Sequence, residues 1–479
     1  MRVLLFHGYM LRGTGSNIYN LNLARALAKL GHEVHLLCQD RQVQIEGVEI
    51  HNPDIHGLLP VYVKDPYEGF EVKAFPELTD EELDRYIDAN VEAVLNVAAQ
   101  AGDIDAALAN HLVMGPAILA RADIGDFAVK IHGSALEYTV KPHPRFLPFA
   151  AEGLEAASGV LVGSRHTAES LWTTLPDVPG LKQKTRLGPP GVDTEAFRPT
   201  PAPPAGGAVG GTAPEDALAT GRGGGSPAAT GPAGDGSPSR IVFVGKLIVS
   251  KGVDLLLAAW PLVRAEHPDA KLEVAGYGEY EDGLRKLLAA LEEGDLDVTR
   301  GIAAVGWGLE GGEEKPLPIL SAFLASPPEG YGDACRAAAG SVEFIGRLEH
   351  DEVAELLPGA EALVMPSTFP EAFGMVAAEA AACGVLPVSA GHSGMLEVSR
   401  KLMEALPVDV GPLTSFPVEE GAVEAIAERL NGWLGLPEEH RAAAREGLVE
   451  TARRLWSWEG VAGGVIAASR GDLDRLPDA

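Results

Sequence analysis

The sequence predicts an α/β fold with two doubly wound domains, each built on a parallel β-sheet. The chain has 479 residues, enough for two or three domains. Its two halves open with the same order of segments, namely an apolar strand, a Gly-rich or polar turn, a helix and a second strand. This order is the βαβ unit of a parallel sheet. A stretch rich in Gly, Pro and Ala at residues 201–239 separates the halves and is typical of a flexible linker or surface insertion.

The first half begins with a βαβ unit whose turn is rich in glycine. We expect its strand, turn, helix and second strand at residues 2–7, 8–15, 18–30 and 33–38. Ligands of doubly wound folds bind beyond the carboxyl ends of the strands, and amides at the start of a helix attract phosphate. The dinucleotide fingerprint fails here, because Ile18 stands where it requires a third glycine. The turn is therefore either a phosphate-binding loop or a tight turn needed only for packing.

The second half repeats this plan with a lysine-bearing turn. We expect a strand, a helix and a second strand at residues 241–245, 253–265 and 271–275. Lys246 and Lys251 flank the turn between the strand and the helix. Two cations at a turn that faces a cleft could neutralise a diphosphate, with each lysine acting as a point charge. The alternative is a solvated pair of surface lysines.

Two glutamates flank the start of an alanine-rich helix in the second half. A strand is expected at residues 362–365 and a helix at 375–383, so Glu371 lies in the loop before the helix and Glu379 inside it. A buried carboxylate is costly unless it is paired or meets ligand hydroxyls, which makes Glu379 a candidate site residue. The helix start at Phe373 and Gly374 offers amides to an anion. Alternatively, Glu371 only complements the helix dipole and Glu379 faces solvent.

Composition excludes several classes of partner. The chain has 38 Lys and Arg against 68 Asp and Glu, a net charge of −30, which argues against binding to nucleic acid or to anionic lipid through a basic anchor. Three widely spaced cysteines match neither a disulfide framework nor a zinc knuckle, as in a reducing compartment. No leader pattern or long apolar run is present, so we expect no transmembrane segment and a cytoplasmic, soluble protein.

At this point a resemblance becomes specific. Glu371 and Glu379, with Phe373 and Gly374 between them, resemble the signature of GT-B retaining glycosyltransferases, in particular glycosyltransferase family 4. Five further segments resemble family segments in the same order, at residues 13–16, 129–133, 189–199, 244–256 and 455–459. The match covers nearly the whole chain outside residues 201–239 and about 294–340. The chain departs from the family pattern at Lys246, which replaces an arginine, and at Pro190, which replaces an asparagine.

The resemblance implies a catalytic set of three residues and a donor-binding set of eight. The catalytic set is His132, Lys251 and Glu371, and the donor-binding set is Gly15, Lys246, Lys251, Arg347, Glu371, Phe373, Gly374 and Glu379. The two lysines would hold the donor diphosphate, although Lys246 lacks the bidentate fork of the usual arginine. Glu379 would bind the ribose hydroxyls and Glu371 the hydroxyls of the transferred sugar.

The remaining implied roles are less specific. His132 would lie near the 6-hydroxyl of the sugar or its anomeric centre, but by position alone it could be a hydrogen-bonded core residue. Phe373 and Gly374 would offer amides to sugar and phosphate. Gly15 would let its loop approach the phosphate or the acceptor, and Arg347 would border the base.

The resemblance also implies a GT-B domain organisation with two Rossmann-like domains facing a cleft. Residues 1–200 would form the acceptor-side domain, 201–239 the linker and 240–449 the donor domain. Residues 294–340 are rich in Gly, Glu and Pro and read as an irregular insertion, over the cleft or on the surface, with helical material expected at residues 317–324. The tail, residues 450–479, would cross back to the first domain.

The implied reaction is transfer of a hexose from a UDP-, GDP- or ADP-linked sugar to an acceptor hydroxyl, with retention, to form an α-glycoside. We expect no cofactor and no metal, since the Asp-x-Asp strings at residues 103–105, 295–297 and 472–474 are better explained as helix starts. Two alternatives stay open, a nucleotide-sugar epimerase and a non-catalytic protein that binds a nucleotide sugar.

Overall fold

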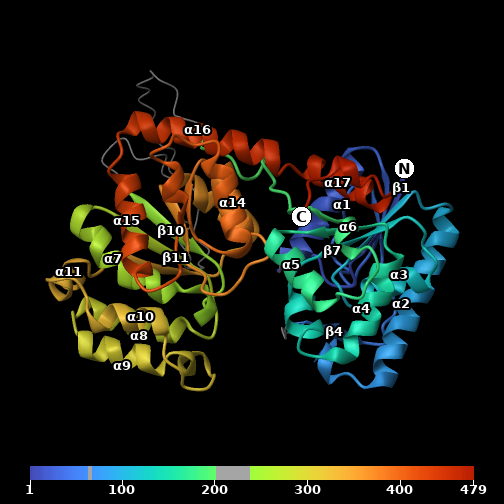
Figure 1. The fold of residues 1–479 in the computed structure, drawn as a ribbon, viewed down its shortest axis with the longest axis horizontal. Helices are drawn as coiled ribbons and strands as arrows, with labels where there is room; N and C mark the ends of the chain where they lie inside the picture. Colours follow the sequence, from blue (N-terminus) through green and yellow to red (C-terminus); the bar gives the residue numbers. More distant parts are fainter. Residues whose placement is uncertain (14, 63–66, 201–237) are drawn as a thin grey trace, which may run out of the picture.

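The computed structural model describes residues 1–13, 15–62, 67–200 and 238–479. It confirms the predicted fold class, because the chain forms two parallel sheets in two Rossmann-like halves (Figure 1). The linker predicted at residues 201–239 falls almost entirely outside the described residues. No helix in the described ranges is both long enough and apolar enough to cross a membrane.

The first half contains a seven-stranded parallel sheet in the order β3-β2-β1-β6-β7-β8-β9. Its strands are β1 (Arg2–Phe6), β2 (Glu33–Leu37), β3 (Val48–His51), β6 (Ala106–Asn110), β7 (Phe127–Ile131), β8 (Gly159–Val162) and β9 (Thr185–Leu187). A separate parallel pair is formed by β4 (Leu58–Val61) and β5 (Glu71–Ala74). The helices are α1 (Gly15–Lys29), α2 (Asp80–Ala101), α3 (Gly115–Arg121), α4 (Leu147–Ala156), α5 (Arg165–Thr174) and α6 (Leu181–Lys184).

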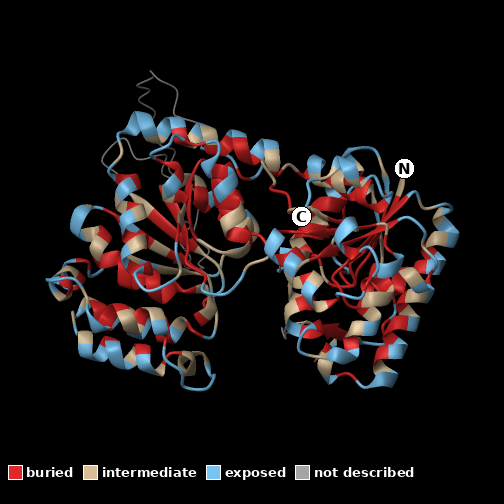
Figure 2. Ribbon diagram, viewed as in Figure 1, coloured by how far each residue is buried: buried red, intermediate tan, exposed pale blue. Residues whose placement is uncertain are grey.

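Strand β1 shows that the sheet of the first half is covered on both faces. Val3 and Leu5 belong to the core that includes residues of α1, whereas Leu4 and Phe6 belong to the core that includes residues of α2, α3 and α4. Successive side chains of a strand point to opposite faces, so a continuous apolar strand is buried on both sides. Figure 2 shows the same pattern across the molecule, with buried residues in the strands and exposed ones on the outer helices.

The second half contains a six-stranded parallel sheet in the order β12-β11-β10-β13-β14-β15. Its strands are β10 (Arg240–Val244), β11 (Lys271–Ala275), β12 (Val342–Gly346), β13 (Ala362–Met365), β14 (Leu386–Ala390) and β15 (Ser415–Phe416). The helices are α7 (Val253–Glu266), α8 (Glu281–Glu292), α9 (Leu296–Val305), α10 (Pro318–Ala325), α11 (Tyr331–Ala337), α12 (His350–Leu356), α13 (Met375–Ala382), α14 (Ser393–Met403), α15 (Ala422–Leu434) and α16 (Glu438–Leu455).

Residues 294–340 are more regular than expected: the helix expected at residues 317–324 is confirmed as α10, and two further helices flank it. They contain α9, α10 and α11, which pack with α7 and α8 on the side of the second sheet. Helix α9 begins at a cap that the sequence does contain, since Asp295 accepts hydrogen bonds from the backbone of Asp297 and Val298 at 3.2 and 3.0 Å. Helices α9 and α11 were not predicted, because the many Gly, Pro and Glu residues around them obscure the helical pattern of apolar residues.

The C-terminal end of the second half contacts the first half. Val192 donates a backbone hydrogen bond to Trp456 at 2.7 Å. After α16 the chain continues into α17 (Trp458–Ser469), which packs on α1, β6, β7 and β8 of the first half (Figure 1). Gly191 lies so close to Trp458 that an added Cβ would be 2.5 Å from Cδ2 of that ring. The end of the chain is therefore part of the first domain's outer layer.

Candidate active site in the interdomain cleft

A cleft of about 1810 Å³ lies between the two domains and is lined by residues of both. Because all strands of each sheet are parallel, their carboxyl ends share one edge, and the loops that follow them line the cleft. Eight of the nine residues predicted for the site line it, namely Gly15, His132, Lys246, Lys251, Arg347, Glu371, Phe373 and Gly374. Glu379 is not among its lining residues.

The loop before α13 lies against the first domain. An added Cβ at Gly163 would be 2.7 Å from the carbonyl oxygen of Ala372, and one at Gly133 would be 3.3 Å from its Cβ. Gly374 has a φ of 120°, a backbone conformation that favours glycine, and it caps the start of α13. The amides at this helix start thus open into the cleft where the two domains meet.

Lys251 and Glu371 form an ion pair at this helix start. Glu371 also accepts a hydrogen bond from the hydroxyl of Ser367 at 2.9 Å, and its backbone amide donates to the hydroxyl of Ser393 at 2.9 Å. Lys251 ends a short 3-10 turn that stops at Gly252, whose φ is 65° and whose added Cβ would collide with the carbonyl of Pro366. The turn and the loop are thereby held in contact with each other.

Glu379 is buried and paired, not exposed. Its carboxylate accepts a hydrogen bond from Nε2 of His350 at 2.9 Å. Burial disfavours the charged form of His350, but the hydrogen bond and the charge of Glu379 outweigh it and raise the pKa of His350 above its ordinary value. The neighbours of His350 in the chain, Glu349 and Asp351, line the cleft, so this pair lies just behind the cleft wall.

His132 belongs to a chain of hydrogen bonds at the carboxyl edge of the first sheet. Its Nε2 donates to Oδ1 of Asn110 at 2.8 Å, and the amide nitrogen of Asn110 donates to Oδ1 of Asn20 at 2.7 Å. Asn20 in turn contacts Nδ1 of His7 at 3.0 Å. Burial, with a smaller contribution from His111, lowers the pKa of His132 well below its ordinary value, so this imidazole is neutral near neutral pH.

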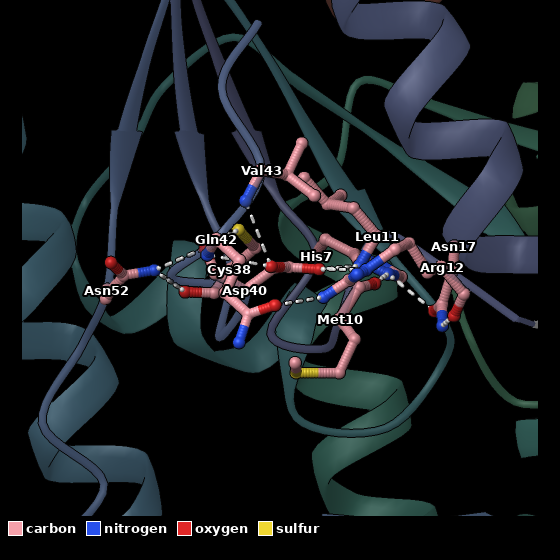
Figure 3. Close-up of polar contacts among 10 residues, drawn as sticks. All are labelled: His7, Met10, Leu11, Arg12, Asn17, Cys38, Asp40, Gln42, Val43 and Asn52. Atoms are coloured by element: carbon pink, nitrogen blue, oxygen red, sulfur yellow. Dashed lines mark hydrogen bonds and ion pairs between the residues drawn. The ribbon is translucent and has the colours of Figure 1, made fainter. Parts of the chain in front are cut away.

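Asp40 holds the glycine-rich turn of the first domain (Figure 3). Its buried carboxylate accepts from the backbone of Leu11 at 3.3 Å and from Nε of Arg12 at 3.4 Å. It also accepts from the backbone of Gln42 and Val43, at 3.1 and 3.2 Å. With four donors satisfied, this carboxylate positions the loop that leads to α1.

The fold is shared with solved glycosyltransferases of the GT-B type. Sucrose-phosphate synthase from Thermosynechococcus elongatus superposes with a TM-score of 0.55 at 18% identity, over 99% of this chain and 98% of that one. Anabaena HepE in complex with UDP and glucose superposes with a TM-score of 0.53 at 14% identity, over 97% of this chain and 98% of that one. At such identities the likeness shows the fold.

Two family models match the chain. Residues 13–196 match Glycosyltransferase Family 4, and residues 233–296 and 336–449 match Glycosyl transferases group 1. The chain is a family 4-like protein with the GT-B fold. The gap between the matched segments of the second model falls within residues 294–340, so α10 and most of α9 and α11 lie outside the matched segments.

Curated relatives match this family 4-like protein over part of their length. A protein from Corynebacterium glutamicum, named GDP-mannose-dependent monoacylated alpha-(1-6)-phosphatidylinositol monomannoside mannosyltransferase, is 28% identical over 220 residues. The aligned part is 45% of this chain and 42% of the relative. The chain covers less than half the length of the curated relatives it matches.

The structure adds residues that the sequence reasoning missed. Asn20 and Asn110 link His132 to the glycine-rich turn, and His350 pairs with Glu379. Lys130 is buried at the cleft with its pKa lowered by burial to about 7, and its Nζ donates to the carbonyl of Gly188 at 2.5 Å. For Asn20 the available signal was a polar residue on the buried side of α1, where Asn17 and Asn22 are also buried, whereas Asn110 ends the buried strand β6.

One group among the described residues has metal-ligand spacing. It consists of His35, Glu49 and His51. None of the three lines the cleft. Of the Asp-x-Asp strings expected at helix starts, residues 295–297 begin α9 and residues 472–474 begin a short 3-10 helix. The expectation is wrong for residues 103–105, which precede strand β6.

Proposed function

We propose that this family 4-like protein transfers a hexose from a nucleotide-diphosphate sugar to an acceptor hydroxyl, in the cleft between its domains. The observation that carries the proposal is the grouping of Lys246, Lys251 and the start of α13 on one wall, opposite His132 on the other. Supporting it, one structural neighbour holds UDP and glucose, and one curated relative is named for GDP-mannose.

The donor diphosphate would lie between the two lysines and the amides at the start of α13. In a chain of net charge −30, these are local cationic and dipolar groups that favour an anion. They would stabilise the charge that develops on the leaving phosphate oxygen as the glycosidic bond breaks. Since the amides at the start of α13 and the two lysines would supply this stabilisation, we propose that the transfer is metal-independent and needs no cofactor.

The stereochemistry proposed is retention, giving an α-glycoside. A covalent mechanism would need a free carboxylate beside the anomeric carbon. Glu371, the carboxylate in the loop before α13, is already paired with Lys251 and bonded to Ser367. We therefore propose a front-face displacement, in which the leaving phosphate accepts the proton of the acceptor hydroxyl while the new bond forms on the same face.

Further residues in the cleft and just behind its wall would hold the base, the ribose and the transferred sugar of the donor. The guanidinium of Arg347 lies 4.9 Å from the ring centroid of Tyr277, and both line the cleft, so the pair offers a flat face to the base. Glu379, hydrogen-bonded to His350 just behind the cleft wall, would accept from the ribose hydroxyls. His132, neutral and oriented through Asn110, would hold a hydroxyl of the transferred sugar.

The test is an NMR-monitored incubation with UDP-glucose, GDP-mannose, ADP-glucose and UDP-N-acetylglucosamine, with EDTA and a pool of hydroxyl acceptors. We expect release of one nucleoside diphosphate, faster with acceptor, and a new anomeric signal of α configuration. A matched pair of variants, Lys251→Ala in the cleft and Lys286→Ala on the exposed face of α8, separates the site from general charge effects. A changed donor sugar without any acceptor would instead indicate an epimerase.

A further inference from the structure

A cluster of two histidines and one glutamate lies at the edge of the first sheet, away from the cleft. We propose that His35, His51 and Glu49 form a structural binding site for a divalent transition-metal ion of the Zn²⁺ class. The proposal does not depend on the transfer reaction, because none of these residues lines the cleft.

The parallel pairing of β2 with β3 brings the three side chains to one face. His35 is paired with Glu49, and Leu37 is paired with His51. Since side chains alternate along a strand, His35, Glu49 and His51 all point to the same side. Val48 and Ile50 point to the other side, where they pack against the core that includes α1. The cluster is thus fixed by strand register rather than by loop conformation.

The spacing of the ligand atoms fits tetrahedral coordination. Nδ1 of His35 lies 3.2 Å from Nε2 of His51 and 3.5 Å from Oε2 of Glu49, and Nε2 of His51 lies 3.9 Å from Oε1 of Glu49. With metal–ligand bonds of about 2.0–2.1 Å, two ligands of a tetrahedral zinc ion stand about 3.3 Å apart. The histidine pair already meets that value, and rotation of the exposed glutamate closes the remaining distance.

A second carboxylate orients the first histidine. Nε2 of His35 lies 3.4 Å from Oε1 of Glu33, so with an ion bound this nitrogen would donate to Glu33 and Nδ1 would present its lone pair to the ion. Metal-binding histidines commonly donate their other N–H to a carboxylate in this way.

Burial and charge fit a cation that enters from solvent. The His35 side chain is 5% exposed and that of His51 17%, whereas Glu49 is 63% exposed. The ion would therefore pass Glu49 and keep a water in its fourth position. Two imidazoles with a carboxylate favour Zn²⁺, Co²⁺ or Ni²⁺ over Mg²⁺ or Ca²⁺, which prefer oxygen ligands. The bound ion would fasten the four-residue edge strand β3 to β2.

The test titrates the chelator-stripped full-length chain with Zn²⁺, and with Co²⁺ to observe the visible bands of tetrahedral coordination. We expect one ion per chain. His51→Asn should weaken binding at least about 100-fold, and Glu33→Gln about 10-fold, as for removal of an orienting partner. The matched control is His56→Asn, because His56 is exposed and pairs only with Asp54 of its own loop.

Two further readouts separate loss of a ligand from loss of folding. The stripped His51→Asn variant should keep the circular dichroism and unfolding temperature of the stripped wild type, while only the wild type gains stability from Zn²⁺. The proposal is overturned if the wild type binds no ion stoichiometrically. It is equally overturned if His51→Asn and Glu49→Gln bind Zn²⁺ as tightly as His56→Asn does.

Discussion

At the scale of single residues, the ion pair of Lys251 and Glu371 joins two proposed roles. Lys251 is proposed to meet the donor phosphate, and Glu371 the hydroxyls of the transferred sugar, yet in this structure they contact each other. Donor binding would therefore exchange part of this ion pair for contacts with the donor. Both side chains are 27% exposed, so the pair is reachable from the cleft.

Removing the lysine should lower turnover more than it affects folding. We expect Lys251→Ala to reduce kcat about 100- to 1000-fold, the usual effect of losing one group that stabilises a developing anion. Glu371→Gln should also reduce kcat. The increase in activation free energy of the double variant should be smaller than the sum of the increases in the two single variants, because the two residues are in contact. Steady-state kinetics check this, and a Lys251→Ala enzyme with wild-type kcat would contradict it.

The pair of His350 and Glu379 predicts a pH dependence of stability. The pKa of His350 is higher in the folded chain than in the unfolded one. Its contribution is therefore fully present below the unfolded pKa, about 6.5, and is lost as pH rises through the raised folded value. We expect His350→Gln to be destabilised by about 1 kcal/mol near pH 5.5, allowing for partial exposure, and by much less near pH 9. Urea unfolding at both pH values checks this, and an equal loss at both would contradict it.

At the scale of elements, the segment outside the matched family models forms a hydrogen bond with the lysine-bearing turn. Glu310 ends the 3-10 helix η5 (Trp307–Glu310) between α9 and α10, and its carboxylate accepts a hydrogen bond from the backbone of Val249 at 2.7 Å. Val249 begins the short turn that ends at Lys251. An element outside the family models therefore holds a turn that lies at the proposed phosphate site.

Removing this contact should affect catalysis more than stability. We expect Glu310→Ala to lower kcat/KM about 10-fold by loosening the turn, with partial rescue in Glu310→Gln, which keeps an accepting oxygen. Glu313→Ala is the matched control, since Glu313 is exposed on the same segment. If Glu310→Ala and Glu313→Ala have equal kcat/KM, the turn does not depend on this carboxylate.

The sequence predicted the regular elements well where apolar runs defined them. The strand at β13 was predicted with the bounds that the structure shows, and the helix at α13 differs by one residue. The contacts of the site residues could not be predicted from the sequence, because they join segments that are far apart in the chain. For Glu379 the sequence indicates a need for a partner or ligand hydroxyls, but it does not identify His350, which comes from the start of α12. The link between His132 and Asn20 likewise appears only when α1, β6 and β7 are brought together.

At the scale of the whole molecule, the cleft exists only while the two domains stay in contact. Glu397 of α14 accepts a hydrogen bond from the backbone of Arg165, at the start of α5, at 2.5 Å. Burial raises the pKa of Glu397, as expected for a carboxylate enclosed at a domain contact. Beside this contact, Gly163 of the first domain touches Ala372 of the loop before α13.

A small wedge at this contact should separate the domains. Gly163→Ala places a Cβ 2.7 Å from the carbonyl oxygen of Ala372, so the loop must shift. We expect kcat/KM to fall by up to about 100-fold from misplaced reacting groups, with a larger radius of gyration in small-angle scattering. Gly301→Ala is the control, since an added Cβ there meets nothing within 4 Å. Unchanged kcat/KM in Gly163→Ala would show that this contact does not shape the site.

The most direct measurement of the central claim is calorimetric titration of the whole chain with UDP, GDP and ADP. We predict that one of them binds with one site per chain. The double variant Lys246→Ala/Lys251→Ala should weaken that binding about 10- to 100-fold, and added salt should weaken it in the wild type. The control Lys286→Ala should bind as the wild type does. Absence of binding by all three, or equal binding by the double variant, would contradict a nucleotide-sugar site in this cleft.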